Sequence, residues 1–145
     1  MPADTPIRIL LVEDDARLQS LGRKILEKHG YLVMVSGDGR GAVEMAASAH
    51  PDLVLMDVSL PEMDGLEATR LIKHDQSDLP IVALTAHAME RDRERTHNAG
   101  CDGFLSKPYQ IPDLLAVVSA HLRPADRQRG RVRTLTSMVP VADPT

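Results

Sequence analysis

Several features are scarce in these 145 residues, and each scarcity excludes a class of protein. The single cysteine, Cys101, excludes an intramolecular disulfide framework and a cysteine-rich zinc site. No apolar run approaches the ~20 residues that a membrane-spanning helix needs. The first residues, Met-Pro-Ala-Asp-Thr-Pro, lack the basic and apolar regions of a signal peptide. We therefore expect a cytoplasmic protein with no membrane partner.

Aromatic residues are also scarce, at 2% of the chain, so the core must be built from aliphatic side chains. The net charge of -4 conceals an asymmetry, because residues 123–145 carry five arginines and two aspartates. Residues 1–122 carry 12 basic and 19 acidic residues, a balance that argues against nucleic-acid binding and is typical of a protein that holds a cation. The basic stretch has little periodic apolar pattern and is predicted to be disordered.

The chain does contain a regular alternation of short apolar runs and amphipathic segments. Strands are predicted over residues 7–12, 31–35, 53–57, 81–85 and 102–107, and helices over 16–29, 41–49, 64–73, 89–97 and 112–122. Five strand–helix units in succession imply a parallel sheet with helices on both faces. We expect one α/β domain over residues 7–122, preceded by a flexible segment 1–6 and followed by the tail 123–145.

Chemically notable side chains stand at the ends of the predicted strands. Residues 53–56 are all apolar, as in a strand buried on both faces, and the run ends on Asp57. The carboxyl ends of parallel strands lie along one edge, where α/β proteins bind ligands. Carboxylates gathered there would repel one another, a conflict that Mg²⁺ removes, while lysine and threonine suit phosphate oxygens. The other notable strand ends are Glu13 and Asp14, Thr85, and Lys107.

Each of these residues also has an ordinary structural interpretation. The acidic run Glu13-Asp14-Asp15 could simply cap a helix and favour its positive end. Thr85 alone would usually be a strand former, and Lys107 alone a solvated charge. The functional interpretation depends on their joint occurrence, because no structural need places acids, a hydroxyl and an ammonium group on one edge.

Four segments resemble the motifs of the receiver domains of two-component response regulators. They are Leu-Leu-Val-Glu-Asp-Asp at 10–15, Leu-Met-Asp-Val-Ser-Leu-Pro-Glu-Met-Asp-Gly at 55–65, Ala-Leu-Thr-Ala at 83–86 and Asp-Gly-Phe-Leu-Ser-Lys-Pro at 102–108. The resemblance covers residues 7–122 nearly without gaps. It implies a flavodoxin-like doubly wound (βα)₅ fold, a five-stranded parallel sheet of order 2-1-3-4-5, and a cis bond between Lys107 and Pro108.

The resemblance also implies a role for each matching position. Asp57 is similar to the aspartate that accepts a phosphoryl group. The implied Mg²⁺ ligands are Glu13, Asp14, Asp57 and the backbone carbonyl of Ser59. The groups implied to hold the phosphoryl oxygens are Thr85, the N–H of Ala86, and Lys107. Thr85 and Phe104 match a pair that switches together, although many family members have tyrosine where this chain has Phe104, so a hydroxyl hydrogen bond is lost here.

The expected function is that of a response regulator that is phosphorylated by a histidine kinase or a histidine phosphotransfer protein. It would catalyse only its own phosphorylation and autodephosphorylation, and would signal by contact with a downstream protein or by onward phosphotransfer. The contact face is expected over 89–97, 103–107 and 112–122. The alternatives are a receiver fragment of a hybrid histidine kinase and a pseudo-receiver interaction module.

Two other classes fit the residues poorly. Haloacid-dehalogenase-like phosphohydrolases need a second aspartate two residues after the nucleophile, where this chain has Ser59. Flavodoxin-like FMN binders use a phosphate loop after the first strand, and the acidic run at 13–15 would repel a phosphate there.

Overall fold

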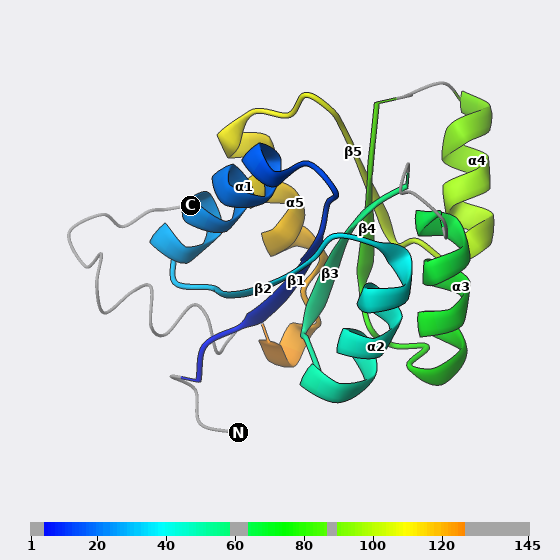
Figure 1. Ribbon diagram of the computed structural model, residues 1–145, viewed down its shortest axis with the longest axis horizontal. Coiled ribbons are helices and arrows are strands. Elements are labelled where there is room, and N and C mark those ends of the chain that lie inside the picture. The colour runs from blue at the N-terminus through cyan, green and yellow to red at the C-terminus, as the bar shows by residue number, and fades with distance from the viewer. Residues whose placement is uncertain (1–4, 59–63, 87–89, 127–145) are drawn as a thin grey trace.

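The protein's computed structural model describes residues 5–58, 64–86 and 90–126. Within these ranges five parallel strands form one sheet in the order β2-β1-β3-β4-β5, which confirms the predicted fold (Figure 1). The strands are β1 (Arg8–Val12), β2 (Leu32–Ser36), β3 (Leu53–Asp57), β4 (Ile81–Thr85) and β5 (Gly103–Ser106). The helices are α1 (Ala16–Lys28), α2 (Gly39–Ala49), α3 (Gly65–Asp75), α4 (Glu90–Ala99) and α5 (Ile111–His121).

The middle of the sheet explains why the apolar runs lack polar alternation. Every residue of β3 and β4 is buried, because helices cover both faces of these strands. Asp57 lies at the end of β3 and is only 2% exposed, so its carboxyl group is enclosed by the fold rather than presented on a surface turn.

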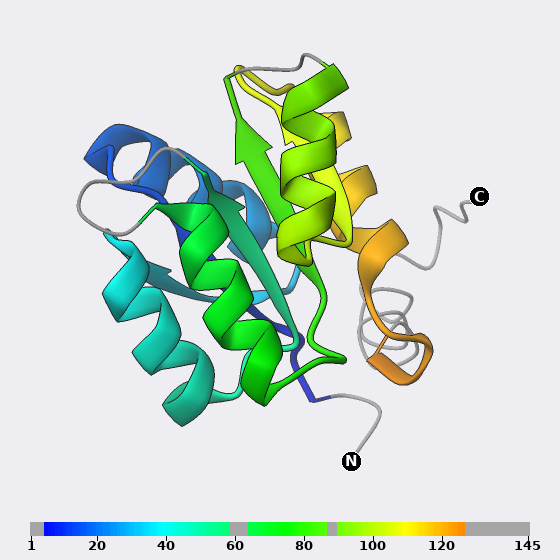
Figure 2. The ribbon, with the colours of Figure 1, turned by 90° about the vertical axis from the view of Figure 1, so that its right-hand side faces the viewer.

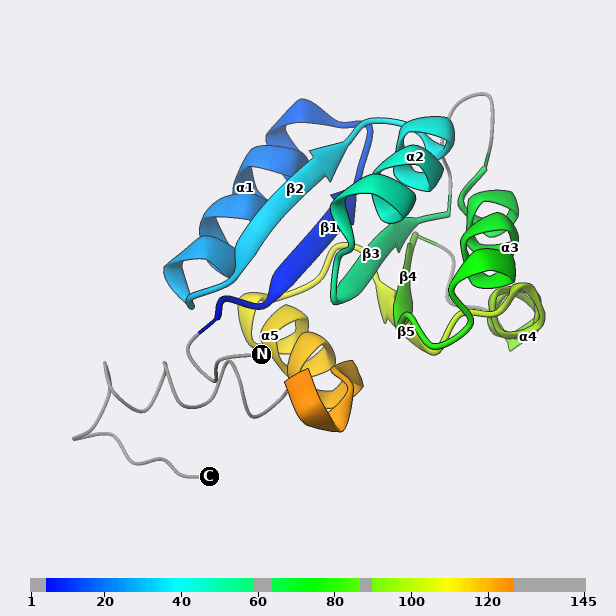
Figure 3. The ribbon, with the colours of Figure 1, turned by 90° about the horizontal axis from the view of Figure 1, so that it is seen from below.

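Two aliphatic layers form the core, one on each face of the sheet. Figures 2 and 3 show the helices that lie on the two faces. Residues alternate between the faces along each strand, so Leu11 joins the layer under α1 and α5, whereas Leu10 and Val12 join the other layer. Leu114 and Val118 of α5 belong to the first layer, and small alanines of α2 and α3 to the second. Helices α2, α3 and α4 cover this second face.

The helix boundaries follow local capping chemistry. The side chains of Asp15, Asp38 and Asp64 each accept a hydrogen bond from a backbone N–H in the first turn of the helix that follows. For α3, Asp64 Oδ1 accepts from the N–H of Glu67 at 2.8 Å. Gly30 follows α1 with a φ of 93°, a left-handed conformation that favours glycine and ends the helix.

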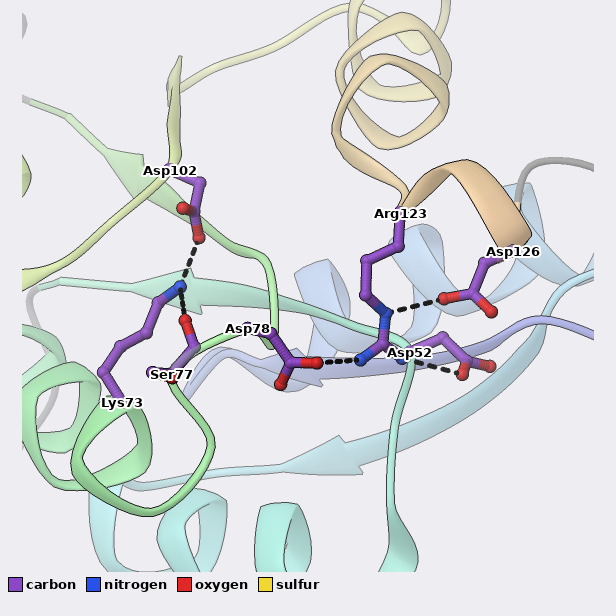
Figure 4. Close-up of polar contacts among 7 residues, drawn as sticks. All are labelled: Asp52, Lys73, Ser77, Asp78, Asp102, Arg123 and Asp126. Atoms are coloured by element: carbon purple, nitrogen blue, oxygen red, sulfur yellow. Dashed lines mark hydrogen bonds and ion pairs between the residues drawn. The ribbon is translucent and has the colours of Figure 1, made fainter.

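Two aspartates stand directly before strands and cap the neighbouring strand at the amino-terminal edge of the sheet. Asp52 precedes β3, and its Oδ2 accepts from the N–H of Arg8 in β1 at 2.9 Å. Asp102 precedes β5, and its Oδ2 accepts from the N–H of Ile81 in β4 at 2.9 Å and from Lys73 Nζ at 2.7 Å (Figure 4). Each carboxylate thus accepts a hydrogen bond from the first backbone N–H of a neighbouring strand, a donor that would otherwise lack a partner within the sheet.

The segment after α5 is tied to this same edge by Arg123. Its Nη2 lies 3.4 Å from Asp52 Oδ1, its Nη1 lies 3.4 Å from Asp78 Oδ2, and its Nε donates to Asp126 Oδ2 at 2.8 Å (Figure 4). Asp52 and Asp126 are each 6% exposed, so at least two of these pairs are shielded from water. The guanidinium group therefore joins the loops before β3 and β4 to the end of the described chain.

These contacts revise the predicted boundary of the tail. The sequence predicts disorder from residue 123 onward because the apolar pattern ends there. In the structure, however, Arg123 and Asp126 pack against the domain. Long-range ion pairs with Asp52 and Asp78 leave no periodic signal in the sequence. The rest of the predicted tail, residues 127–145, and the segment 1–4 lie outside the described residues.

Among the residues that the structure describes, no helix combines the length and apolar character required to cross a bilayer.

Candidate functional site

The carboxyl-terminal edge of the sheet brings together acids from two neighbouring strands. Glu13 and Asp14 follow β1, and Asp57 ends β3. One carboxylate oxygen from each of the three lies within 4.8 Å of the others, a spacing that fits a shared cation. Glu13 and Asp57 are 1% and 2% exposed, whereas Asp14 is exposed. The cluster is therefore open to solvent on the side of Asp14.

Lys107, which follows β5, supplies the positive charge of the cluster. Its Nζ lies 3.1 Å from Glu13 Oε1 and 3.1 Å from Asp57 Oδ2. Burial alone would lower the pKa of Lys107, but its bonds to Asp57 and Glu13 outweigh burial and raise the pKa. The side chain thus stays an ammonium group at neutral pH and bridges two carboxylates.

One ammonium group does not fully compensate the acids. Burial raises the pKa of Glu13, the nearby charge of Asp57 raises it further, and the contact with Lys107 offsets only part of this rise. The charged form of Glu13 is therefore disfavoured in this pocket. Hard cations with oxygen ligands, Mg²⁺ above all, suit such a donor set, so the residues present fit the ion that the sequence predicted.

The other predicted site residues lie at the same edge where the structure describes them. Thr85 ends β4 and is 2% exposed, and its carbonyl accepts from the N–H of Lys107 at 2.7 Å. Ala86 follows it and is exposed. The peptide bond between Lys107 and Pro108 is cis, in agreement with the expectation. Ser59, the predicted carbonyl ligand, lies outside the described residues.

Phe104 lies beside this group on β5, away from the acids. It pairs with Ala83 of β4, just as Ser106 pairs with Thr85, so Phe104 and Thr85 share a face of the sheet. The guanidinium carbon of Arg93, on α4, lies 5.2 Å from the centre of the Phe104 ring, a cation–π contact. A cavity of about 290 Å³ between α4 and β5 is lined by both side chains and by His97.

Two residues of the pocket were given no role by the sequence analysis. Gly65 begins α3, and a Cβ there would lie 2.1 Å from the backbone oxygen of Asp57, so only glycine allows this approach. Gln19 of α1 donates from its side-chain amide to the carbonyl of Glu13. The glycine that ends the 55–65 motif is a usable sequence signal for the first, but a helical glutamine carries no comparable signal for the second.

Comparison with known proteins decides the family. The family model described as the response regulator receiver domain matches residues 9–119. This chain belongs to that family. The receiver is 37% identical over 116 residues to the polar-differentiation response regulator DivK of Brucella ovis, which covers 79% of this chain and 94% of DivK.

Solved receivers have the same fold. The chemotaxis protein CheY4 of Vibrio cholerae superposes with a TM-score of 0.79 at 27% identity, over 81% of this receiver and 100% of CheY4. The receiver domain of the sensor histidine kinase PA1611 from Pseudomonas aeruginosa superposes with a TM-score of 0.75 at 37% identity, over 81% and 98% of the two chains. That structure has a magnesium ion coordinated in its active-site cleft.

Proposed function

We propose that this receiver takes a phosphoryl group from a phosphohistidine onto Asp57 in the presence of Mg²⁺, and that the modification changes the surface formed by α4, β5 and α5. The donor would be a histidine kinase or a histidine phosphotransfer protein, and the output a protein contact or onward transfer to another histidine. The receiver would thereby act as a regulatory phosphoacceptor in a two-component relay.

The observation that carries this proposal is the surroundings of the Asp57 carboxylate. A buried carboxylate is a candidate nucleophile only where charge around it is arranged for a reaction. Asp57 has the ammonium group of Lys107 at 3.1 Å and the carboxylates of Glu13 and Asp14 within a shared 4.8 Å. The proposed nucleophile, the proposed phosphate-binding ammonium group and the candidate metal ligands therefore belong to one cluster.

In the proposed transfer, one bond to phosphorus forms and one breaks. A carboxylate oxygen of Asp57 bonds to phosphorus while the phosphorus–nitrogen bond of the phosphohistidine breaks, and the imidazole nitrogen keeps the electron pair. Lys107 and Thr85 lie at the same edge and would hold phosphoryl oxygens, so positioning and electrostatics would perform most of the work. Attack of water on the acyl phosphate would later release inorganic phosphate, which is the expected autodephosphorylation.

Glu13, Asp14 and Asp57 are the described residues that would hold Mg²⁺, and Ser59 is the expected further ligand. When bound, the ion would neutralise negative charge on the phosphoryl oxygens during transfer. The pKa of Glu13 is raised by burial and then by the charge of Asp57, and the ion would relieve this second effect. Protons and Mg²⁺ would therefore compete for this cluster, and binding should strengthen as pH rises.

Incubation with acetyl phosphate tests the transfer without a cognate kinase. With Mg²⁺, intact-mass spectrometry should show one added phosphoryl group, and EDTA should suppress the addition. Borohydride reduction of the acyl phosphate, followed by peptide mapping, should place the modification at Asp57. Modification at another residue, or equal labelling with and without Mg²⁺, would contradict the proposed site.

The proposed output surface rests on the position of Phe104. Thr85 would move toward the phosphoryl oxygens, and the Phe104 ring, on the same sheet face, would fill the space that Thr85 leaves. The ring is held from outside by Arg93, so its movement would change the contact between β5 and α4. Because phosphorylation shifts such an equilibrium only by its differential affinity, the unmodified receiver should already sample the active form.

Amide-shift mapping by NMR tests this output. Beryllofluoride with Mg²⁺ should mimic the phosphoryl group, and shifts should extend from Asp57 and Thr85 through Phe104 into residues 90–99 and the start of α5. In the Arg93→Ala variant the shifts in α4 should shrink while those at Asp57 persist. Changes confined to the loops around Asp14, Asp57 and Lys107 would exclude this surface as the output.

A further inference from the structure

The loop that follows β1 is held in place by several backbone contacts. The N–H of Glu13 donates to the carbonyl of Ser36 at 3.0 Å, which ties the end of β1 to the end of β2. The N–H of Asp15 donates to Glu13 Oε2 at 3.3 Å, and Asp15 Oδ1 caps α1 by accepting from Arg17 and Leu18. Residues 13 and 15 are thus fixed on either side of Asp14.

Asp14 itself is held differently. Its carboxylate is exposed, and its side chain makes no hydrogen bond or ion pair with any residue that the structure describes. The backbone therefore fixes where this side chain starts and which directions its rotamers can reach, and the peptide unit that joins Glu13 to Asp14 is the part of the backbone directly before it. The carbonyl oxygen of Glu13 belongs to that unit.

The side chain of Gln19, in α1, forms a hydrogen bond with this carbonyl. Its Nε2 donates to the Glu13 oxygen, and the same amide lies 3.6 Å from the position of a Cβ on Gly37, in the turn after β2. Gln19 is half-buried, and its contact spans from the helix to the start of the loop. The Glu13–Asp14 peptide plane is therefore anchored by a side chain whose hydrogen bond, among the described residues, goes to a backbone carbonyl rather than to a carboxylate.

We propose that Gln19 is a positioning residue for cation binding, which acts by orienting the Glu13–Asp14 peptide so that the Asp14 carboxylate faces those of Glu13 and Asp57. This inference rests on the proposed Mg²⁺ site. It matters because Mg²⁺ demands near-ideal octahedral geometry, and a ligand held only through its backbone loses that geometry when the backbone is released. Partners that orient metal ligands typically account for 10–100-fold in metal affinity.

The test compares Gln19→Met with wild type in the full chain. Methionine keeps the length of the side chain but removes the donor. Ser20→Met, the same new residue at the exposed neighbouring position of α1, is the matched control. Calorimetric titration with MgCl₂ should show about tenfold weaker binding for Gln19→Met and no change for Ser20→Met. Gln19→Met removes one hydrogen bond and Ser20→Met removes none that the structure describes, so both variants should fold and the affinity reports geometry.

A second readout needs no metal. In EDTA, the amide signals of Asp14 and Asp15 in Gln19→Met should shift and exchange faster with solvent, while amides of the distant strand β5 stay unchanged. Equal Mg²⁺ affinity in wild type and Gln19→Met would overturn the role of Gln19 and leave the proposed function intact. Absence of Mg²⁺ binding by wild type would overturn both.

Discussion

Replacement of Asp57 by Asn is expected to abolish phosphorylation by acetyl phosphate. The amide has no anionic oxygen to bond to phosphorus. Among the described carboxylates at this edge, Glu13 is the other one that is buried and 3.1 Å from Lys107, and burial raises the pKa of Glu13, which disfavours its anionic form. We expect the rate to fall by about 10³-fold or more, the scale on which loss of a nucleophile acts. Intact-mass spectrometry after incubation with acetyl phosphate and Mg²⁺ measures the effect.

Asp15→Asn is the matched control for this variant. It removes the same charge one residue beyond the cluster, and asparagine caps a helix as well as aspartate does. Labelling and thermal stability should therefore both remain near those of wild type. Labelling of Asp57→Asn at the wild-type rate would show that another residue accepts the phosphoryl group. An equal loss of labelling in Asp15→Asn would show that the loss follows from removing a negative charge rather than from removing the nucleophile.

Gly65→Ala is expected to produce the largest loss of stability among conservative substitutions near the site. The added Cβ would lie 2.1 Å from the backbone oxygen of Asp57 and 2.7 Å from the Cα of Val58. Both obstacles are main-chain atoms at the end of a buried central strand, so no side-chain rotation relieves the clash. We expect the free energy of unfolding to fall by about 3 kcal/mol or more, at the upper end of the usual cost of overpacking. Urea denaturation followed by circular dichroism measures the loss.

Gly37→Ala is the control for a glycine without such an approach. A Cβ there would meet only the Gln19 amide at 3.6 Å, an ordinary contact, so the change should be close to neutral or stabilise by up to about 1 kcal/mol. If Gly65→Ala unfolds at the same urea concentration as wild type, α3 begins farther from Asp57 than the structure places it.

The sequence predicts the fold well because its strongest signals are local. The apolar run 53–56 and the alternation of strands and helices determine a parallel sheet, and Asp64 and Gly30 mark helix ends through capping and backbone chemistry. The strand order came from the resemblance to a family, since alternation alone permits several orders. The helices extend one or two residues beyond some predicted ends, as in α3, which continues to Asp75.

The site could be predicted only where strand ends converge. The 3.1 Å contacts of Lys107 with Glu13 and Asp57 join residues 94 and 50 positions apart, and parallel topology is sufficient to anticipate them. The Arg123 ion pairs could not be anticipated, because they join loops before strands to a segment after α5. The hydrogen bond from Gln19 to the carbonyl of Glu13 could not be anticipated either, because it depends on a side-chain direction that the sequence pattern does not indicate.

The anchoring of Arg123 and Asp126 has a practical consequence for immobilised assays. Residue 126 is fixed at the edge where β1, β3 and β4 begin, roughly 15 Å, the length of a five-residue strand, from the edge that carries Asp57. A biotin or affinity tag attached after residue 126 therefore holds the domain on a sensor chip with the acidic pocket directed toward the flowing solution. A partner in the flow would reach the edge that carries Asp57, and a tag before β1 would also lie at the opposite edge, beside the Asp52–Arg123 pair.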